Sequence, residues 1–107
     1  MLLREIAHAR TGDKGDIVTI SLIAWHPEDF PLLEQQITAE RVQAHFASLI
    51  DRPVLRYSIP HLSALTFVLQ RPQGQAVTRS LALDAHGKCL GSALLAMQLE
   101  PRPASGA

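Results

Sequence analysis

Alternation of apolar and polar residues is the clearest pattern in this chain, and it predicts β-strands. The pattern is strongest over residues 17–25, where one face carries Val18, Ile20, Leu22 and Ala24. The opposite face carries Ile17, Thr19, Ser21, Ile23 and Trp25. Residues 3–10 show a weaker alternation, and a glycine-containing loop at residues 12–16 follows them. Two strands joined through such a loop predict a β-hairpin.

Helical spacing replaces the alternation in the middle of the chain. Asp29 is a suitable cap for a short helix with Pro31 near its first turn. Thr38 is a suitable cap for a second helix of about three turns, which ends at residues 51–53. The apolar stripe of this second helix is Val42, Phe46, Leu49 and Ile50.

The remainder of the chain is expected to return to strands, over residues 54–58, 65–70, 77–83 and 90–99. Turns are expected at residues 71–75 and at 84–88. The Ala-Leu richness of residues 90–99 leaves a helix open there as an alternative. The sum is an α+β fold, in which an antiparallel sheet carries helices on one face and leaves the other for solvent or a partner.

Length and charge narrow the classes of function. The chain has 107 residues, and we expect one domain over residues 1–100 and a frayed tail over 101–107. Ten basic and ten acidic residues balance, which disfavours nucleic acid and anionic membranes as partners. With one cysteine, Cys89, and no membrane-spanning run, a cytoplasmic setting is expected.

Residues 12–16 are the first candidate for chemistry. Asp13, Lys14 and Asp16 form a polar cluster, and backbone N–H groups near Gly12 and Gly15 could bind an anion. The alternative is that these residues only form the turn. The charge of the lysine competes with any cation between the two aspartates, which disfavours a metal.

Arg79 is the second candidate, because alternation places it on an apolar strand face. Such an arginine needs a carboxylate partner or a bound anion. Asp13 or Asp16 could be that carboxylate, which would create one polar pocket from both segments. The alternative is that Arg79 extends to water from an edge or a bulge.

Other catalytic or cofactor signatures are weak. Ser80 lies in no nucleophile elbow, and no histidine base is fixed near Cys89 by spacing. The five histidines include no pair with metal-ligand spacing, and no phosphate loop or dinucleotide fingerprint occurs. The sequence therefore predicts neither a metal nor a cofactor.

Several strings resemble one known family: ARTGDKGD followed by ISLIA, TAERVQAHF, RYSIPHLSALTFVL, VTRSLALDAHGK and LGSALLAMQLE. The family is the small C-terminal domain of the acyclic terpene utilisation protein AtuA, which also exists as a free-standing short protein. The resemblance runs from about residue 3 to residue 99. It implies a ferredoxin-like α+β fold and a setting in acyclic terpene or acyl-CoA catabolism, beside a larger AtuA-like protein.

The resemblance also marks individual residues. The early loop matches at Arg10, Gly12, Asp13, Lys14, Gly15 and Asp16, and the late segment matches at Thr78, Arg79, Ser80, Leu81, Asp84, Gly87 and Lys88. The candidate ligand-binding residues are therefore Arg10, Asp13, Lys14, Asp16, Arg79 and Ser80. This chain has Thr19 and Thr66 where the family usually has asparagine, and Ser21 where it usually has glycine.

Three functions remain open. The favoured one is an accessory or assembly subunit that docks on a larger AtuA-like protein and forms homo-oligomers. The second is a hydratase- or isomerase-like enzyme acting on an acyl-CoA or terpenoid acid, with Asp13 or Asp16 as base. The third is a binding module that holds a small anionic ligand at Lys14 and Arg79.

Overall fold

The fold is an antiparallel sheet covered on one face by helices. The computed structural model describes residues 1–50, 52–70 and 87–100, with residues 13 and 87–89 described by their backbone alone. Its four strands are β1 (Ala7–Lys14), β2 (Ile17–Ala24), β3 (Leu55–Ile59) and β4 (Ala64–Gln70). They lie in the order β1-β2-β4-β3, and every neighbouring pair is antiparallel.

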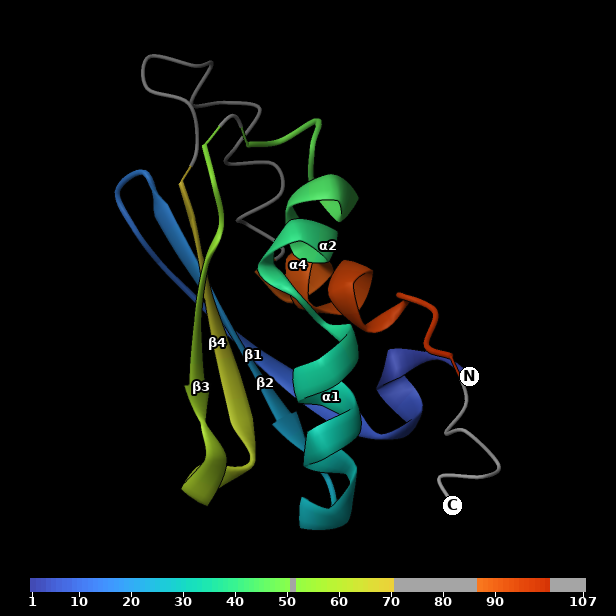
Figure 1. Cartoon of the computed structure of the whole chain (residues 1–107). Helices are drawn as coiled ribbons and strands as arrows, with labels where there is room; N and C mark the ends of the chain where they lie inside the picture. Colours follow the sequence, from blue (N-terminus) through green and yellow to red (C-terminus); the bar gives the residue numbers. More distant parts are fainter. Residues whose placement is uncertain (51, 71–86, 101–107) are drawn as a thin grey trace.

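The helices form a single layer on one side of this sheet (Figure 1). They are α1 (Phe30–Gln36), α2 (Ala39–His45) and α4 (Gly87–Leu95). Three short 3-10 turns, Leu3–Glu5, Pro27–Asp29 and Pro60–Leu62, connect the elements. This is the predicted α+β, ferredoxin-like fold, with helices on one face of an antiparallel sheet.

The order of the described elements shows how this fold is related to the ferredoxin-like βαββαβ unit. In that unit the first and third strands are central and the other two form the edges. If the two ends of the βαββαβ unit are joined and the chain is opened before the second strand, the new order along the chain is two strands, a helical segment, two strands and a helix. The same operation gives the sheet order found here, with β2 and β4 in the centre.

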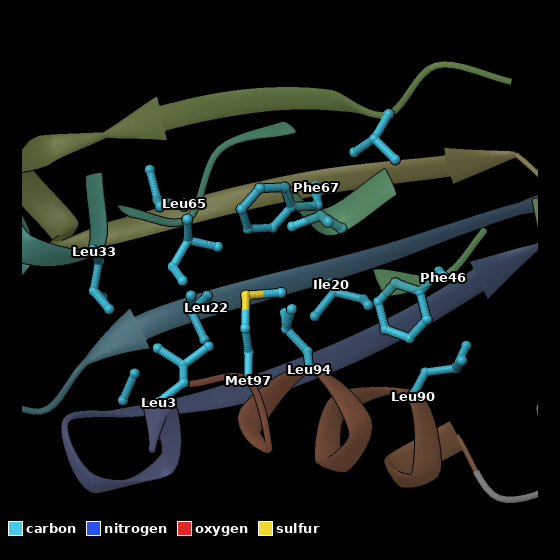
Figure 2. Packing of buried hydrophobic residues seen from close by; sticks show 14 of the residues in the cluster. Leu3, Ile20, Leu22, Leu33, Phe46, Leu65, Phe67, Leu90, Leu94 and Met97 are labelled. Atoms are coloured by element: carbon cyan, nitrogen blue, oxygen red, sulfur yellow. The ribbon is translucent and has the colours of Figure 1, made fainter. Parts of the chain in front are cut away.

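The core lies between the sheet and the helices, where the predicted alternation is confirmed. The inward face of β2 is Val18, Ile20, Leu22 and Ala24, and that of β4 includes Leu65, Phe67 and Leu69, all buried. Figure 2 shows Leu94 and Met97 pointing toward the Ile20 and Leu22 side chains of the sheet. Each such side chain contributes about 1.5–3 kcal/mol by leaving water.

The first strand differs from its prediction at both ends. Residues 3–5 form a 3-10 turn, and β1 begins at Ala7. It then continues to Lys14, so most of the expected loop is strand and only Gly15 and Asp16 turn the chain. Pairing with β2 along its whole length overrides the turn preference of these residues.

The strand predicted over residues 90–99 is wrong, because α4 spans Gly87–Leu95. The turn expected at 84–88 is also wrong at Gly87 and Lys88, which begin this helix, while 84–86 lie outside the described residues. Leu90 and Leu94 are buried one helical turn apart, and Met97, just beyond the helix, is buried as well. Over Gly87–Leu95 the structure follows this helical spacing rather than the alternation of Ala93, Leu95, Met97 and Leu99.

The helices before β3 begin where the sequence predicts. The Thr38 side chain caps α2 by accepting a hydrogen bond from the Arg41 N–H at 3.1 Å. The helix is shorter than the predicted three turns, although Phe46 beyond its end is still buried. Asp29 occupies the cap position of α1, but its side chain makes no capping hydrogen bond there.

The two ends of the described chain lie side by side. The Leu3 N–H donates to the Met97 carbonyl at 2.9 Å, and the Leu99 N–H donates to the Met1 carbonyl at 2.7 Å. The Gln36 side chain then pairs with the backbone of Glu100, at 3.0 and 2.7 Å. These bonds attach the last described residues both to the first residues and to α1.

Helix α4 approaches β1 closely at Gly91. A Cβ atom at this buried position would lie 3.5 Å from both Ala9 Cβ and Thr11 Cγ2, which is ordinary van der Waals contact. The site therefore has room for one methyl group.

We expect Gly91→Ala to stabilise the domain by about 0.5–1 kcal/mol, because alanine favours helix and the methyl group fits. The melting temperature should rise by a few degrees, on the order of 4–8 °C per kcal/mol. Gly91→Leu should lower it, since the larger side chain must separate α4 from β1. Calorimetry of the three proteins tests this, and a lower melting temperature for the alanine variant would contradict it.

Candidate functional site on the open sheet face

The sheet face opposite the helices is the candidate site, and we call it the open face. Figure 1 shows that no labelled helix lies on this side. Strand register assigns it alternate residues, which form rows across the sheet. The rows are Lys14-Ile17-Gln70, Gly12-Thr19-Val68-Leu55, Arg10-Ser21-Thr66-Tyr57 and His8-Ile23-Ala64-Ile59.

Large apolar side chains are exposed on this face. Ile17 is 42% exposed, and Leu55 and Tyr57 are each 52% exposed. Trp25, which directly follows β2, is 57% exposed, and its ring stacks on that of His8 with centroids 4.2 Å apart. A cluster of this kind on one surface is typical of an interaction site.

Hydroxyl groups occupy the middle of the open face. Ser21 Oγ and Thr66 Oγ1 are 3.2 Å apart and share a hydrogen bond between the two central strands. Thr19 donates a longer hydrogen bond, 3.4 Å, to the Gly12 carbonyl. Ser21, Thr66 and Thr19 are positions at which the sequence differs from the usual residues of the family that it resembles. The sequence pattern placed Thr19 and Ser21 on one face, and the register of β2 with β4 adds Thr66 to it.

Two basic side chains lie along β1 at the edge of the open face. Arg10 and Lys14 are both exposed, and four residues of strand separate their Cα atoms by about 13 Å. Neither charged group has a hydrogen-bond or ion-pair partner among the described residues. Over residues 1–50, 52–70 and 87–100, both cations therefore lack a counter-charge.

Comparison with known proteins identifies the family of this domain. The model of the AtuA ferredoxin-like domain matches residues 1–100. The chain belongs to the AtuA ferredoxin-like domain family. Searches of the curated proteins and of the solved structures found no match. The resemblance stated from the sequence strings is thus confirmed, and with it the ferredoxin-like fold.

In this AtuA ferredoxin-like domain, the predicted site residues divide between several places. Arg10 and Lys14 lie together on the open face, and Asp16 is exposed in the adjoining turn. Asp13 is paired in register with Val18, so its backbone position alternates to the other face of β1. Arg79 and Ser80 lie outside the described residues, as do the expected turn at 71–75 and strand at 77–83. The polar pocket with Arg79 stays a prediction.

Sequence reasoning overlooked the apolar part of the site. It assigned Ile17 and Trp25 to the face opposite the core but gave them no function, and it treated Leu55 and Tyr57 only as strand residues. The available signal was the presence of bulky side chains on a strand face that the helices do not cover. Such residues are unusual on a face that meets only water.

Over residues 1–50, 52–70 and 87–100, no three His, Cys, Asp or Glu side chains gather in a way that could hold a metal ion. Within the same ranges, no helix has the length and apolar character to cross a bilayer.

The turn at Gly15 keeps Lys14 at its place on the open face. Gly15 has φ +64° and is the first of two turn residues, the position at which a type II′ hairpin takes glycine. We expect Gly15→Ala to cost about 1–2 kcal/mol, because alanine is strained there although space is open. Gly15→Asn should cost less, since asparagine tolerates positive φ. Urea unfolding of the wild type and both variants measures the free energy of unfolding, and an equal loss in the two variants would contradict this account.

Proposed function

We propose that this domain is an accessory subunit that docks, through its open face, onto a larger AtuA-like protein in acyclic terpene or acyl-CoA catabolism. The observation that carries the proposal is the exposure of Ile17, Trp25, Leu55 and Tyr57 on one uncovered sheet face. Family membership supports the AtuA-related setting.

The size of the open face suits docking of a protein segment. Four strands about 4.8 Å apart, with up to eight residues each, present on the order of 400 Å². Exposed apolar side chains gathered on one face of a small domain are often functional. The area is about half of what one partner contributes to a standard interface. Docking of a single secondary-structure element is therefore favoured over docking of a broad surface.

The binding-module function has one observation in its favour, which is that the cations Arg10 and Lys14 have no partner within the part of the chain that the structure describes. The enzyme function is less well supported. A carboxylate that serves as a base near neutral pH requires burial, whereas Asp16 is exposed in the turn. The two cations also fit the accessory function equally well, since they can pair with carboxylates of a partner protein.

We expect the domain to co-purify with a larger AtuA-like protein when the two are produced together. Tyr57→Glu should weaken this association by tenfold or more, since an apolar contact is replaced by a charge that must lose water, and tenfold corresponds to about 1.4 kcal/mol. Ala47→Glu, at an exposed position outside the sheet, serves as the control and should bind as the wild type does.

Circular dichroism should first show that both variants are folded. Sedimentation of the domain alone tests the predicted homo-oligomer separately. A wild-type domain that stays monomeric and leaves the larger protein unbound would refute the accessory function. Equal loss of binding for Tyr57→Glu and Ala47→Glu would refute the open face as the docking surface.

A further inference from the structure

We infer that the segment docking on the open face is an acidic amphipathic helix whose carboxylates face β1. This inference rests on the proposed function and adds the chemistry of the partner. It follows from how charge and apolar side chains are distributed over the four rows of the face.

Charge on the open face is of one sign. The ionisable groups of β1 that face this side are His8, Arg10 and Lys14. No aspartate or glutamate occurs at any position of the four rows, although the whole chain has equal numbers of acidic and basic residues. The acidic residues beside Lys14 in the chain are Asp13, whose backbone position alternates to the other face of β1, and Asp16, which lies in the turn. A partner that covers this face must supply the negative charge itself.

Apolar character lies at the other edge of the same face. Leu55 and Tyr57 belong to β3, which is separated from β1 by the two central strands, or about 14 Å. Val68 of β4 and Ile59 of β3 are half-buried beside them. Along the row Arg10-Ser21-Thr66-Tyr57, the face therefore runs from basic through hydroxyl-bearing to apolar, which is the complement of an amphipathic element.

The dimensions favour a helix for that element. A helix is about 10–12 Å across and rises about 1.5 Å per residue, so it can lie lengthwise between the basic and the apolar edges. Carboxylates seven or eight residues apart on one side of it are separated by about 10–12 Å. This is close to the spacing of about 13 Å between Arg10 and Lys14.

A second copy of this chain is a poorer occupant. Its own open face would bring the same rows, which lack any carboxylate, so Arg10 and Lys14 would remain without a counter-charge. Bringing two such faces together would also add cations to cations. Charge complementarity therefore favours a different, acidic partner.

Trp25 provides the readout, because it is the only tryptophan in the chain and stacks on His8 of the open face. The probe is a synthetic helical peptide of about 18 residues, built from Leu and Ala on one face with Glu along one edge. Its control has Lys in place of every Glu. Saturable change of Trp25 fluorescence with the Glu peptide, and none with the Lys peptide, is expected.

Two charge reversals localise the contact. Arg10→Glu should weaken binding of the Glu peptide about tenfold or more, whereas Arg4→Glu, at an exposed position outside the strands, should leave it unchanged. Raising the salt concentration from about 0.05 to 0.5 M should weaken binding to the wild type, because exposed charges are screened.

Failure of this inference is distinguishable from failure of the proposed function. Binding of the larger AtuA-like protein by wild type and Arg10→Glu with the same affinity would leave docking intact and refute the acidic partner. No response to the Glu peptide at millimolar concentration, or an equal response to the Lys peptide, would refute it as well. Saturation by an acyl-CoA in place of the peptide would identify a small-ligand site and overturn it.

Discussion

The register of β2 between β1 and β4 is the constraint on which the rest of the structure depends. Its alternate side chains, from Val18 to Ala24, form the centre of the core, so every neighbouring strand must align with them. A shift of one residue would bring the opposite side chains into the core. The same register therefore makes Arg10, Lys14 and the hydroxyl-bearing residues of the central strands face outward. The packing of the interior and the chemistry of the open face have one cause.

Much of the fold could be predicted because burial leaves a regular pattern in the sequence. The alternation in β2 and β4 and the Thr38 cap were sufficient to place those elements. The strand prediction failed in α4, where the positions of Ala and Leu fit both the period of a strand and the period of a helix. There the helix buries Leu90 and Leu94, one turn apart, and packs Gly91 against Ala9 and Thr11 of β1. The contact with β1 is distant in sequence, so no local pattern contains it.

The candidate site was predictable only in part, for a related reason. Charge and glycine marked residues 10–16, and Arg10 and Lys14 do lie on the open face. The far half of the face comes from β3 and β4, and Thr66 of β4, which shares a hydrogen bond with Ser21 of β2, lies 45 residues further along the chain than Ser21. Pairing between distant strands creates this surface. Sequence patterns describe each strand but not the strand that lies beside it.

The pairing of the first and last described residues has a consequence for how such a domain can be attached to another protein. Residues 1–3 lie against 97–99, on the side of the sheet that carries the helices (Figure 1). A linker joined to either end would therefore leave from nearly the same point, behind the sheet. A partner protein attached before residue 1 or after residue 100 would thus be joined on the side away from Arg10, Lys14 and Tyr57.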